Sequence, residues 1–395
     1  MTGPTPESQP LDSSPASDLD VRAEEPQDEP TVERTVRRPS WLSRPSRRGW
    51  MLIISGATTM ALLLAAFLLP VPFVKLSPGP TFNVIGEDDG KDVIQISGAE
   101  TYPVTGVLDM TTVYETGGPR GGLTFVDAIG SWLNPSDAVV PQELLFPDDM
   151  SSDDVAARQA ILFDTSQSNA VAAAMRFLDR PVTVTVVANA VYSDTPADGA
   201  IEAKDEITAV DGTPVTSAQQ VVDAVRSQPI GTTFEFTVQR EGSEQTVSVT
   251  SKENPDVPGS PFIGIGVGEL YSAGFPIDFT LQDVGGPSAG LMFAVGIVDK
   301  LTPGNLTDGE HIAGTGTIDP DGVVGPIGGI RQKLAGARGA GATLFLMPAD
   351  QCAEAAGLIP DGLTVAPVTS LSEAVDTIDE YTSGQPVPQC PVDAA

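Results

Sequence analysis

The sequence contains one histidine, His311, and two cysteines, Cys352 and Cys390. One histidine excludes a zinc site built from several imidazoles and also the metalloprotease His-Glu-x-x-His helix. The cysteines cannot form a Cys-x-x-Cys site, and we expect neither a metal nor a cofactor. Lys and Arg number 21 against 53 Asp and Glu, so the chain lacks the cationic face that nucleic acids require.

A Walker-type phosphate loop is also missing from the sequence. The nearest string, GEDDGKD at 86–92, has one residue too few between its glycines and ends on Asp where Ser or Thr is needed. We therefore expect no ATPase activity in this chain.

The amino-terminal region predicts a disordered tail followed by a membrane anchor. Pro, Ser, Asp and Glu dominate residues 3–31, and an uncharged apolar run from Trp50 to Leu69 is long enough to cross the ~30 Å hydrocarbon layer. The alternative is a cleaved signal peptide, but the stretch before the run is too long and no clear small-x-small cleavage site follows. By the positive-inside rule, the arginines ahead of the run place the tail in the cytoplasm and all that follows Leu69 outside. The interfacial aromatics would be Trp41 and Trp50, and the arginines are Arg34, Arg37, Arg38, Arg44, Arg47 and Arg48.

The cysteine pair has two interpretations. Outside the membrane the compartment is oxidising, so Cys352 and Cys390 can form a disulfide. Two free thiols are equally compatible with the sequence, because the sequence does not give the separation of the side chains.

A candidate nucleophile, Ser288, lies in the string DVGGPSAGLMFAVGIVDKL at 283–301. Gly-Gly-Pro predicts a tight turn, and a helix is expected near 287–301. At its entrance Ser288 would meet unpaired N–H groups and the positive end of the helix dipole, which can stabilise an oxyanion. The plainer interpretation is a helix N-cap. The string also fits the nucleophile elbow of α/β-hydrolases, but the necessary histidine could only be His311, which follows too soon.

A candidate general base, Lys333, lies in GGIRQKLAGARGAG at 328–341. At 100° per residue it shares an apolar stripe with Ile330, Leu334 and Ala337. A lysine whose pKa is depressed by burial can activate a serine without histidine. The alternative is a side chain that reaches water from the edge of the stripe.

Four strings resemble the Lon protease domain in order and spacing: GGPSAG (285–290), GTGTI (314–318), VGPIGGIRQK (324–333) and AGARGAGATLFLMPA (335–349). The resemblance implies that Ser288 is the nucleophile, Lys333 its base and Thr315 the residue that orders the amine. It further implies an oxyanion site of backbone groups near Ser288, at Gly286 and Ala289. One position departs from the family: the acidic residue usual three before the serine is Gly285, and Asp283 is out of register.

Residues 182–252 resemble a PDZ domain of the bacterial protease type. TPADGAIEAKDEITAVDGTPV at 195–215 is similar to the family signature, with Lys204 where Gly is usual. Such domains bind extended peptides at a sheet edge, although this one could merely pack against the protease. Because VTGVLDMTTV (104–113) and the helix expected at 163–178 are similar to Lon elements that precede the serine, we expect the PDZ domain to be inserted within the protease fold.

Together these features predict an α+β chain that resembles membrane-anchored, PDZ-containing Lon-like serine proteases of bacteria. The expected function is ATP-independent cleavage of unfolded or exposed protein segments outside the membrane, with substrate presented by the PDZ domain. The alternative is an inactive, tethered peptide-binding scaffold. The expected partners are peptide or protein substrates and the membrane. The sequence is also compatible with a homo-oligomer. The expected segments are a tail (1–48), an anchor (49–71), the first part of the Lon-like domain (75–181), the PDZ domain (182–252), the catalytic domain (256–382) and a terminal tail (383–395).

Overall fold

The structure is a computed structural model that describes residues 46–118, 121–146, 152–281 and 284–391. It divides into two units, residues 1–60 and 61–395. Most of the expected cytoplasmic tail lies outside the described residues. The same holds for Trp41, Asp283 and the arginines Arg34, Arg37, Arg38 and Arg44.

Helix α1 (Arg47–Leu68) contains most of the apolar run and has no buried residue. Its mean hydropathy of 2.2 makes it long and apolar enough to cross a membrane, and no other helix among the described residues meets this test. Length and composition alone do not distinguish an anchor from a signal sequence.

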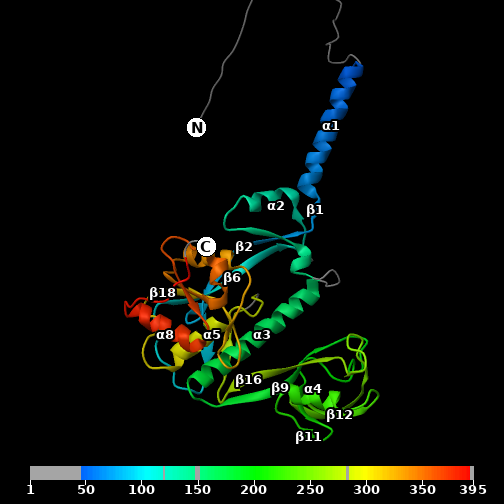
Figure 1. The fold of residues 1–395 in the computed structure, drawn as a ribbon, viewed down its shortest axis with the longest axis vertical. Coiled ribbons are helices and arrows are strands. Elements are labelled where there is room, and N and C mark those ends of the chain that lie inside the picture. Colours follow the sequence, from blue (N-terminus) through cyan, green and yellow to red (C-terminus); the bar gives the residue numbers. More distant parts are fainter. Residues whose placement is uncertain (1–45, 119–120, 147–151, 282–283, 392–395) are drawn as a thin grey trace, which may run out of the picture. The chain divides into compact units, whose positions relative to one another are not determined.

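A mixed sheet of strand order β22-β21-β18-β6-β2-β8 organises the larger part of the second unit. Its first four strands are parallel, whereas β6, β2 and β8 are antiparallel neighbours. The sheet combines strands from both ends of the unit (Figure 1). Their bounds are β2 (Phe73–Asn83), β6 (Val107–Gly117), β8 (Ala138–Pro141), β18 (His311–Gly314), β21 (Leu344–Pro348) and β22 (Thr364–Val368).

Both faces of this sheet are covered, because successive side chains of a strand point to opposite faces. Leu344 and Leu346 of β21 join one apolar core, and Phe345 and Met347 between them join another. The first core includes α5 and parts of α3 and α8, and the second includes α6. These helices are α3 (Ser152–Phe177), α5 (Gly290–Leu301), α6 (Ile330–Ala340) and α8 (Leu371–Thr382).

A second, wholly antiparallel sheet of order β13-β12-β10-β9-β16 has its own core. It lies between the two sets of strands of the first sheet in chain order. Strand β16 comes after residue 252, where we expected this module to end. Glycines at alternate positions, Gly266 and Gly268, hide the strand pattern of β16 in the sequence. The elements are β9 (Val182–Val191), β10 (Glu206–Val210), β11 (Thr213–Pro214), α4 (Ala218–Arg226), β12 (Thr233–Arg240), β13 (Ser243–Thr250) and β16 (Ile265–Ala273).

Short elements complete the fold. Helix α2 (Phe125–Trp132) follows β7 (Leu123–Thr124), which pairs with β1 (Pro70–Val71). The others are β3 (Glu87–Asp88), β4 (Lys91–Asp92), β5 (Ile94–Ile96), η3 (Gln142–Leu144), β14 (Lys252–Glu253), β15 (Pro261–Phe262), β17 (Ile277–Phe279), β19 (Thr317–Ile318), β20 (Val324–Gly325), η4 (Ala349–Gln351) and α7 (Cys352–Ala355).

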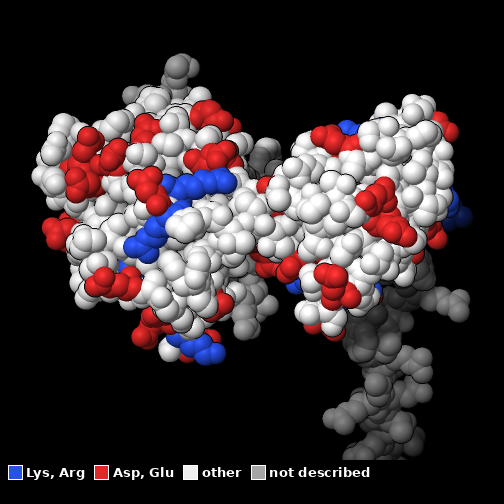
Figure 2. All heavy atoms as spheres, turned by 90° about the horizontal axis from the view of Figure 1, so that it is seen from below, with Lys and Arg blue, Asp and Glu red and all other residues white. Residues whose placement is uncertain are grey.

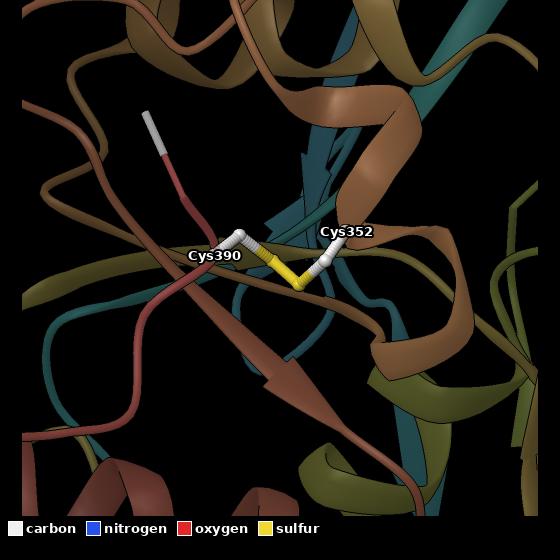
Figure 3. The surroundings of a disulfide bond; sticks show 2 residues. All are labelled: Cys352 and Cys390. Atoms are coloured by element: carbon white, nitrogen blue, oxygen red, sulfur yellow. A yellow bond between two sulfur atoms is a disulfide. The ribbon is translucent and has the colours of Figure 1, made fainter. Parts of the chain in front are cut away.

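Cys352 and Cys390 form a disulfide, so the alternative of two free thiols is wrong (Figure 3). The bond joins the start of α7 to the carboxyl-terminal segment, where the Cys390 N–H also donates to the Val365 carbonyl of β22. A crosslink across a loop of this length stabilises a fold by about 3–4 kcal/mol.

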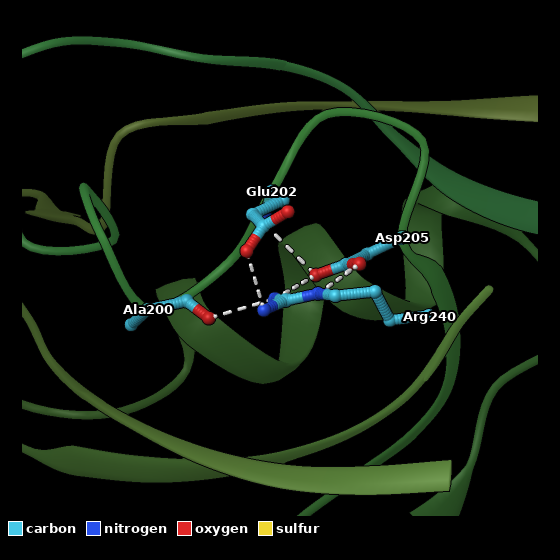
Figure 4. Close-up of polar contacts among 4 residues, drawn as sticks. All are labelled: Ala200, Glu202, Asp205 and Arg240. Atoms are coloured by element: carbon cyan, nitrogen blue, oxygen red, sulfur yellow. Dashed lines mark hydrogen bonds and ion pairs between the residues drawn. The ribbon is translucent and has the colours of Figure 1, made fainter. Parts of the chain in front are cut away.

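An ionic cluster fixes the turn between β9 and β10 in the second sheet (Figure 4). Arg240 binds both oxygens of the buried Asp205 carboxylate, at 2.8 and 2.6 Å, and also contacts Glu202. Burial acts to raise the pKa of Asp205, but the hydrogen bonds from Arg240 and from the Glu202 N–H outweigh it, and the pKa lies below its usual value. Lys204 in the same turn has φ of 75°, which explains why glycine is usual there.

Carboxylates are spread over the face drawn in Figure 2, with basic side chains in small groups among them. This distribution agrees with the net charge of -32.

Candidate active site

Ser288 and Lys333 meet beyond the carboxyl end of β18. Thr315 directly follows this strand, Ser288 lies just ahead of α5, and Lys333 lies in the first turn of α6. Helices α5 and α6 cover opposite faces of the sheet. Their amino-terminal ends can therefore come together only beyond the ends of the strands. Carboxyl ends of parallel strands are the usual place for sites in such sheets.

The side chains form a chain of hydrogen bonds. Lys333 Nζ lies 2.7 Å from Ser288 Oγ and 2.9 Å from Thr315 Oγ1. The Thr315 hydroxyl donates to the Ser288 carbonyl at 3.1 Å, so its oxygen is left to accept from the amine. One amine hydrogen is thereby held by Thr315, and the nitrogen lone pair is free to accept the Ser288 proton.

Lys333 is almost completely buried, with 3% of its surface exposed. The side chain therefore does not reach water from the edge of the stripe. Burial lowers the pKa of Lys333 from 10.5 to about 7. None of the ion pairs among the described residues involves Lys333, so no carboxylate offsets this effect. A substantial fraction of the amine is consequently uncharged near neutral pH.

Helix α5 begins later than the sequence suggested, at Gly290, and its N-cap is Ala289. The interpretation of Ser288 as an ordinary N-cap is therefore wrong. Gly286, with φ of +87°, and Pro287 extend the turn. The Leu291 N–H at the start of α5 donates to the carbonyl of Gly316, the residue just before β19. The whole of α5 is buried, and not only the face that its apolar periodicity indicated.

The backbone donors near Ser288 differ in availability. The Gly286 N–H donates to the Gln159 carbonyl at 3.1 Å. Within the described residues, the N–H groups of Ser288 and Ala289 have no acceptor. The Gly286 N–H is therefore engaged in this conformation, whereas those of Ser288 and Ala289 are not.

Helix α3 holds the turn before Ser288 through residues that the sequence analysis did not single out. Ser166 lies inside α3 and donates to the Pro287 carbonyl at 2.9 Å. Asn169 donates to the Ile318 carbonyl of β19 at 3.1 Å. A Cβ at Gly285 would lie 2.9 Å from Cβ of Gln159. The family's acidic residue therefore has no room here.

A cleft of about 770 Å³ opens onto Ser288 and Lys333. Its walls include the β6 stretch 110–115 and the loop 326–329 ahead of α6. His311 plays no part in it, because it lies at the opposite end of β18 from Thr315, with Nε2 2.8 Å from Asp109 Oδ2. This placement excludes a histidine triad with Ser288.

A smaller groove of about 100 Å³ lies in the second module, between α4 and the segment 261–267. Strand β16 forms the edge of its sheet beside this groove. Glu269 of β16 accepts from the Ala218 N–H at the start of α4 and from the Tyr271 hydroxyl. The Tyr271 N–H donates to the Ser168 hydroxyl of α3 at 2.6 Å. Helix α3 thus contacts both modules.

Comparison with known families identifies both modules. The PDZ domain model matches residues 161–250, and the model of the Lon protease (S16) C-terminal proteolytic domain matches residues 282–379. The chain therefore contains a PDZ domain and a Lon-type proteolytic domain, as the sequence motifs predicted, in a fold of mixed helix and strand.

Two curated Lon proteases match part of the chain. "Lon protease homolog, mitochondrial" of Debaryomyces hansenii is 34% identical over 103 residues, which are 25% of this chain and 9% of that protein. Lon protease 1 of Sorangium cellulosum is 45% identical over 69 residues, 18% of this chain and 8% of that protein. The chain thus spans less than a tenth of the length of these relatives.

Solved structures of PDZ domains are similar to part of the chain. The PDZ domain of an SdrC-like protein from Listeria monocytogenes is 26% identical and covers 21% of this chain and 85% of its own, with a TM-score of 0.20. Its counterpart from Listeria innocua is 28% identical and covers 21% and 92%, with a TM-score of 0.20.

Replacing Lys333 with Met should stabilise the protein at neutral pH. The folded-state pKa of about 7 lies below the ordinary 10.5, so unfolding takes up a proton between these values and stability rises with pH across that window. At about 1.4 kcal/mol per pH unit, the buried amine costs several kcal/mol at pH 7, less about 1 kcal/mol for each lost hydrogen bond. We expect Lys333→Met to gain about 2 kcal/mol in denaturant unfolding at pH 7 and to lose about 2 kcal/mol near pH 10.5, where only the two lost hydrogen bonds count.

Lys300→Met is the matched control. Lys300 is also buried, but it donates to the Ile94 carbonyl at 2.9 Å and lies 3.5 Å from Asp92. Its removal should destabilise the protein. A loss of stability for Lys333→Met at pH 7 would contradict an uncompensated amine.

Proposed function

We propose that this chain is an ATP-independent serine endopeptidase with a Ser288–Lys333 dyad. The observation that carries the proposal is a buried amine, with a pKa of about 7, that lies 2.7 Å from a hydroxyl in an open cleft. A neutral amine in hydrogen-bond reach of a serine satisfies the geometric requirement for an activated nucleophile.

The reaction proceeds through an acyl-enzyme. Ser288 Oγ attacks the scissile carbonyl while its proton passes to Lys333 Nζ. As the C–N bond breaks, Lys333 returns the proton to the leaving amine. Water, deprotonated by the same amine, then hydrolyses the ester. Thr315 orients the amine, the N–H groups of Ser288 and Ala289 bind the oxyanion, and Gly286 joins them once it is released from Gln159.

We further propose that the protease domain comprises the segments on either side of an inserted PDZ domain. The shared sheet of β2, β6, β18 and β21 supports this division, with the PDZ module at 182–273. The groove beside β16 would receive an extended peptide by strand addition and present it for cleavage. Without an ATPase, suitable substrates are unfolded segments, exposed tails and flexible loops.

We propose a single-pass topology with the amino terminus in the cytoplasm and both folded modules outside. The apolar helix α1 and the arginines before it support this orientation. The Cys352–Cys390 disulfide also supports an oxidising compartment.

The competing function is a tethered PDZ scaffold without catalysis. A serine-reactive phosphonate probe distinguishes the two. We expect labelling of the detergent-purified chain without ATP, and loss of labelling in both Ser288→Ala and Lys333→Met. Unchanged labelling in Lys333→Met would remove the lysine from the mechanism, and no labelling of the unaltered chain would favour the scaffold.

Peptidase activity should rise with pH. The protonated amine cannot accept the Ser288 proton, so kcat/KM for a fluorogenic peptide should fall tenfold per pH unit below about 7 and level off above it. A rate that stays constant between pH 5 and 9 would contradict Lys333 as the base.

Ser166→Ala should slow turnover without changing this pH profile. Loss of the bond to the Pro287 carbonyl lets the nucleophile turn shift, and a displacement well below 1 Å is enough to lower kcat about tenfold. Ser166→Thr retains a hydroxyl and should recover part of the rate. If Ser166→Ala moved the midpoint of the profile, or left kcat unaltered, Ser166 would not act by positioning Ser288.

A further inference from the structure

Helix α2 exposes its apolar residues and buries a polar one. Phe125, Ile129 and Trp132 lie at positions i, i+4 and i+7, on one face, and Trp132 is 82% exposed. The neighbouring Leu133 is 77% exposed, whereas Ser131 is buried. In a folded domain surrounded by water, apolar side chains are usually buried and polar ones exposed. An apolar medium or partner is therefore needed to cover this face.

The chain connection places α2 beside the end of the apolar helix. Helix α1 ends at Leu68, and two residues later Pro70 pairs with Thr124, the N-cap of α2. Paired strands lie about 5 Å apart, so α2 begins within one strand spacing of the chain that leaves α1. Whatever the tilt of α1, the start of α2 remains at that end of the span.

A second apolar group lies on the adjoining strands. Phe73 of β2 pairs with Pro141 of β8, and η3 follows Pro141 directly. Leu144 and Leu145 at the end of η3 are exposed, as is Phe73. Asp127 is the one charged side chain of α2. The attraction of this surface is therefore apolar and does not depend on anionic headgroups.

We propose that the α2 face, defined by Phe125, Ile129, Trp132 and Leu133, docks in the bilayer interface of the leaflet in which α1 ends. Amphipathic helices with an aromatic at the interface lie in the membrane plane in this manner. The inference rests on the proposed anchoring role of α1. It commits to lipid as the occupant, because continuity with the span brings lipid to this face in every copy of the chain.

Docking would hold the catalytic cleft close to the membrane. Arg331 of α6 donates to the Pro135 carbonyl just after α2, at 2.9 Å, and Lys75 binds Asp137 at 3.1 Å. Leu145 lines the cleft itself. The substrates favoured by this arrangement are extended segments that lie near the membrane surface.

Tryptophan fluorescence of the full chain in vesicles tests the proposal. The sequence has three tryptophans, so Trp41→Phe with Trp50→Phe leaves Trp132 as the reporter. In vesicles of zwitterionic phosphatidylcholine, Trp132 should emit at a shorter wavelength than a tryptophan exposed to water. It should also be quenched by lipids brominated on the acyl chain near the headgroup. Adding Ile129→Asp and Leu133→Asp should abolish that quenching. A Tyr192→Trp reporter, with the other tryptophans changed to Phe, should stay accessible to acrylamide, because Tyr192 is exposed in the PDZ module.

A second reporter separates failure of the docking from failure of the anchor. With Trp41 and Trp132 changed to Phe, quenching of Trp50 by brominated lipid reports insertion of α1. Quenched Trp50 with Trp132 accessible to acrylamide overturns the docking alone. If Trp132 is shielded from acrylamide but not quenched by brominated lipid, the face is covered by a protein, such as a second copy of the chain. That result also overturns the proposed docking in the bilayer. Trp50 that is not quenched refutes the anchor, and the docking argument with it.

Discussion

The site depends on an amine that is buried without a carboxylate partner. A charged lysine in this position would be costly, and the protein avoids part of the cost by releasing the proton near pH 7. Nothing in the immediate contacts of Lys333 reverses that effect, because its partners are two hydroxyls. The same burial that weakens the fold would supply the base of the proposed mechanism, which is the usual relation between stability and a strained or desolvated site.

Such a site needs rigid surroundings, and α3 supplies much of the rigidity. Its Gln159 carbonyl, Ser166 hydroxyl and Asn169 amide bind the turn and strand on either side of Ser288. Farther along, Ser168 binds Tyr271 of β16 at the edge of the PDZ sheet. One helix therefore contacts both the turn before Ser288 and strand β16, which borders the groove beside α4.

The sequence predicted the local parts of this arrangement. The spacing of Lys333 with Ile330, Leu334 and Ala337 left open whether its side chain is buried or reaches water, and in the structure it is buried. Spacing alone could not predict that Lys333 lies next to Ser288. Their proximity depends on where β18 ends and on where α5 and α6, on opposite faces of the sheet, begin. Ser166 and Gln159 were not identified as site residues because polar residues in a helix usually face solvent. The alanines around 170–174 were the available signal, since a small-residue face indicates close packing.

Gly285 links the departure from the family pattern to the pKa of Lys333. Gly285 lines the same cleft as Ser288 and Lys333, and a carboxylate close to the amine would raise the pKa of Lys333. In this fold Gln159 occupies the space into which a Cβ at Gly285 would project. The packing of α3 thus leaves no room for a carboxylate at position 285, and burial is the cause of the lowered pKa of Lys333. The glycine is therefore part of the same constraint as the buried amine.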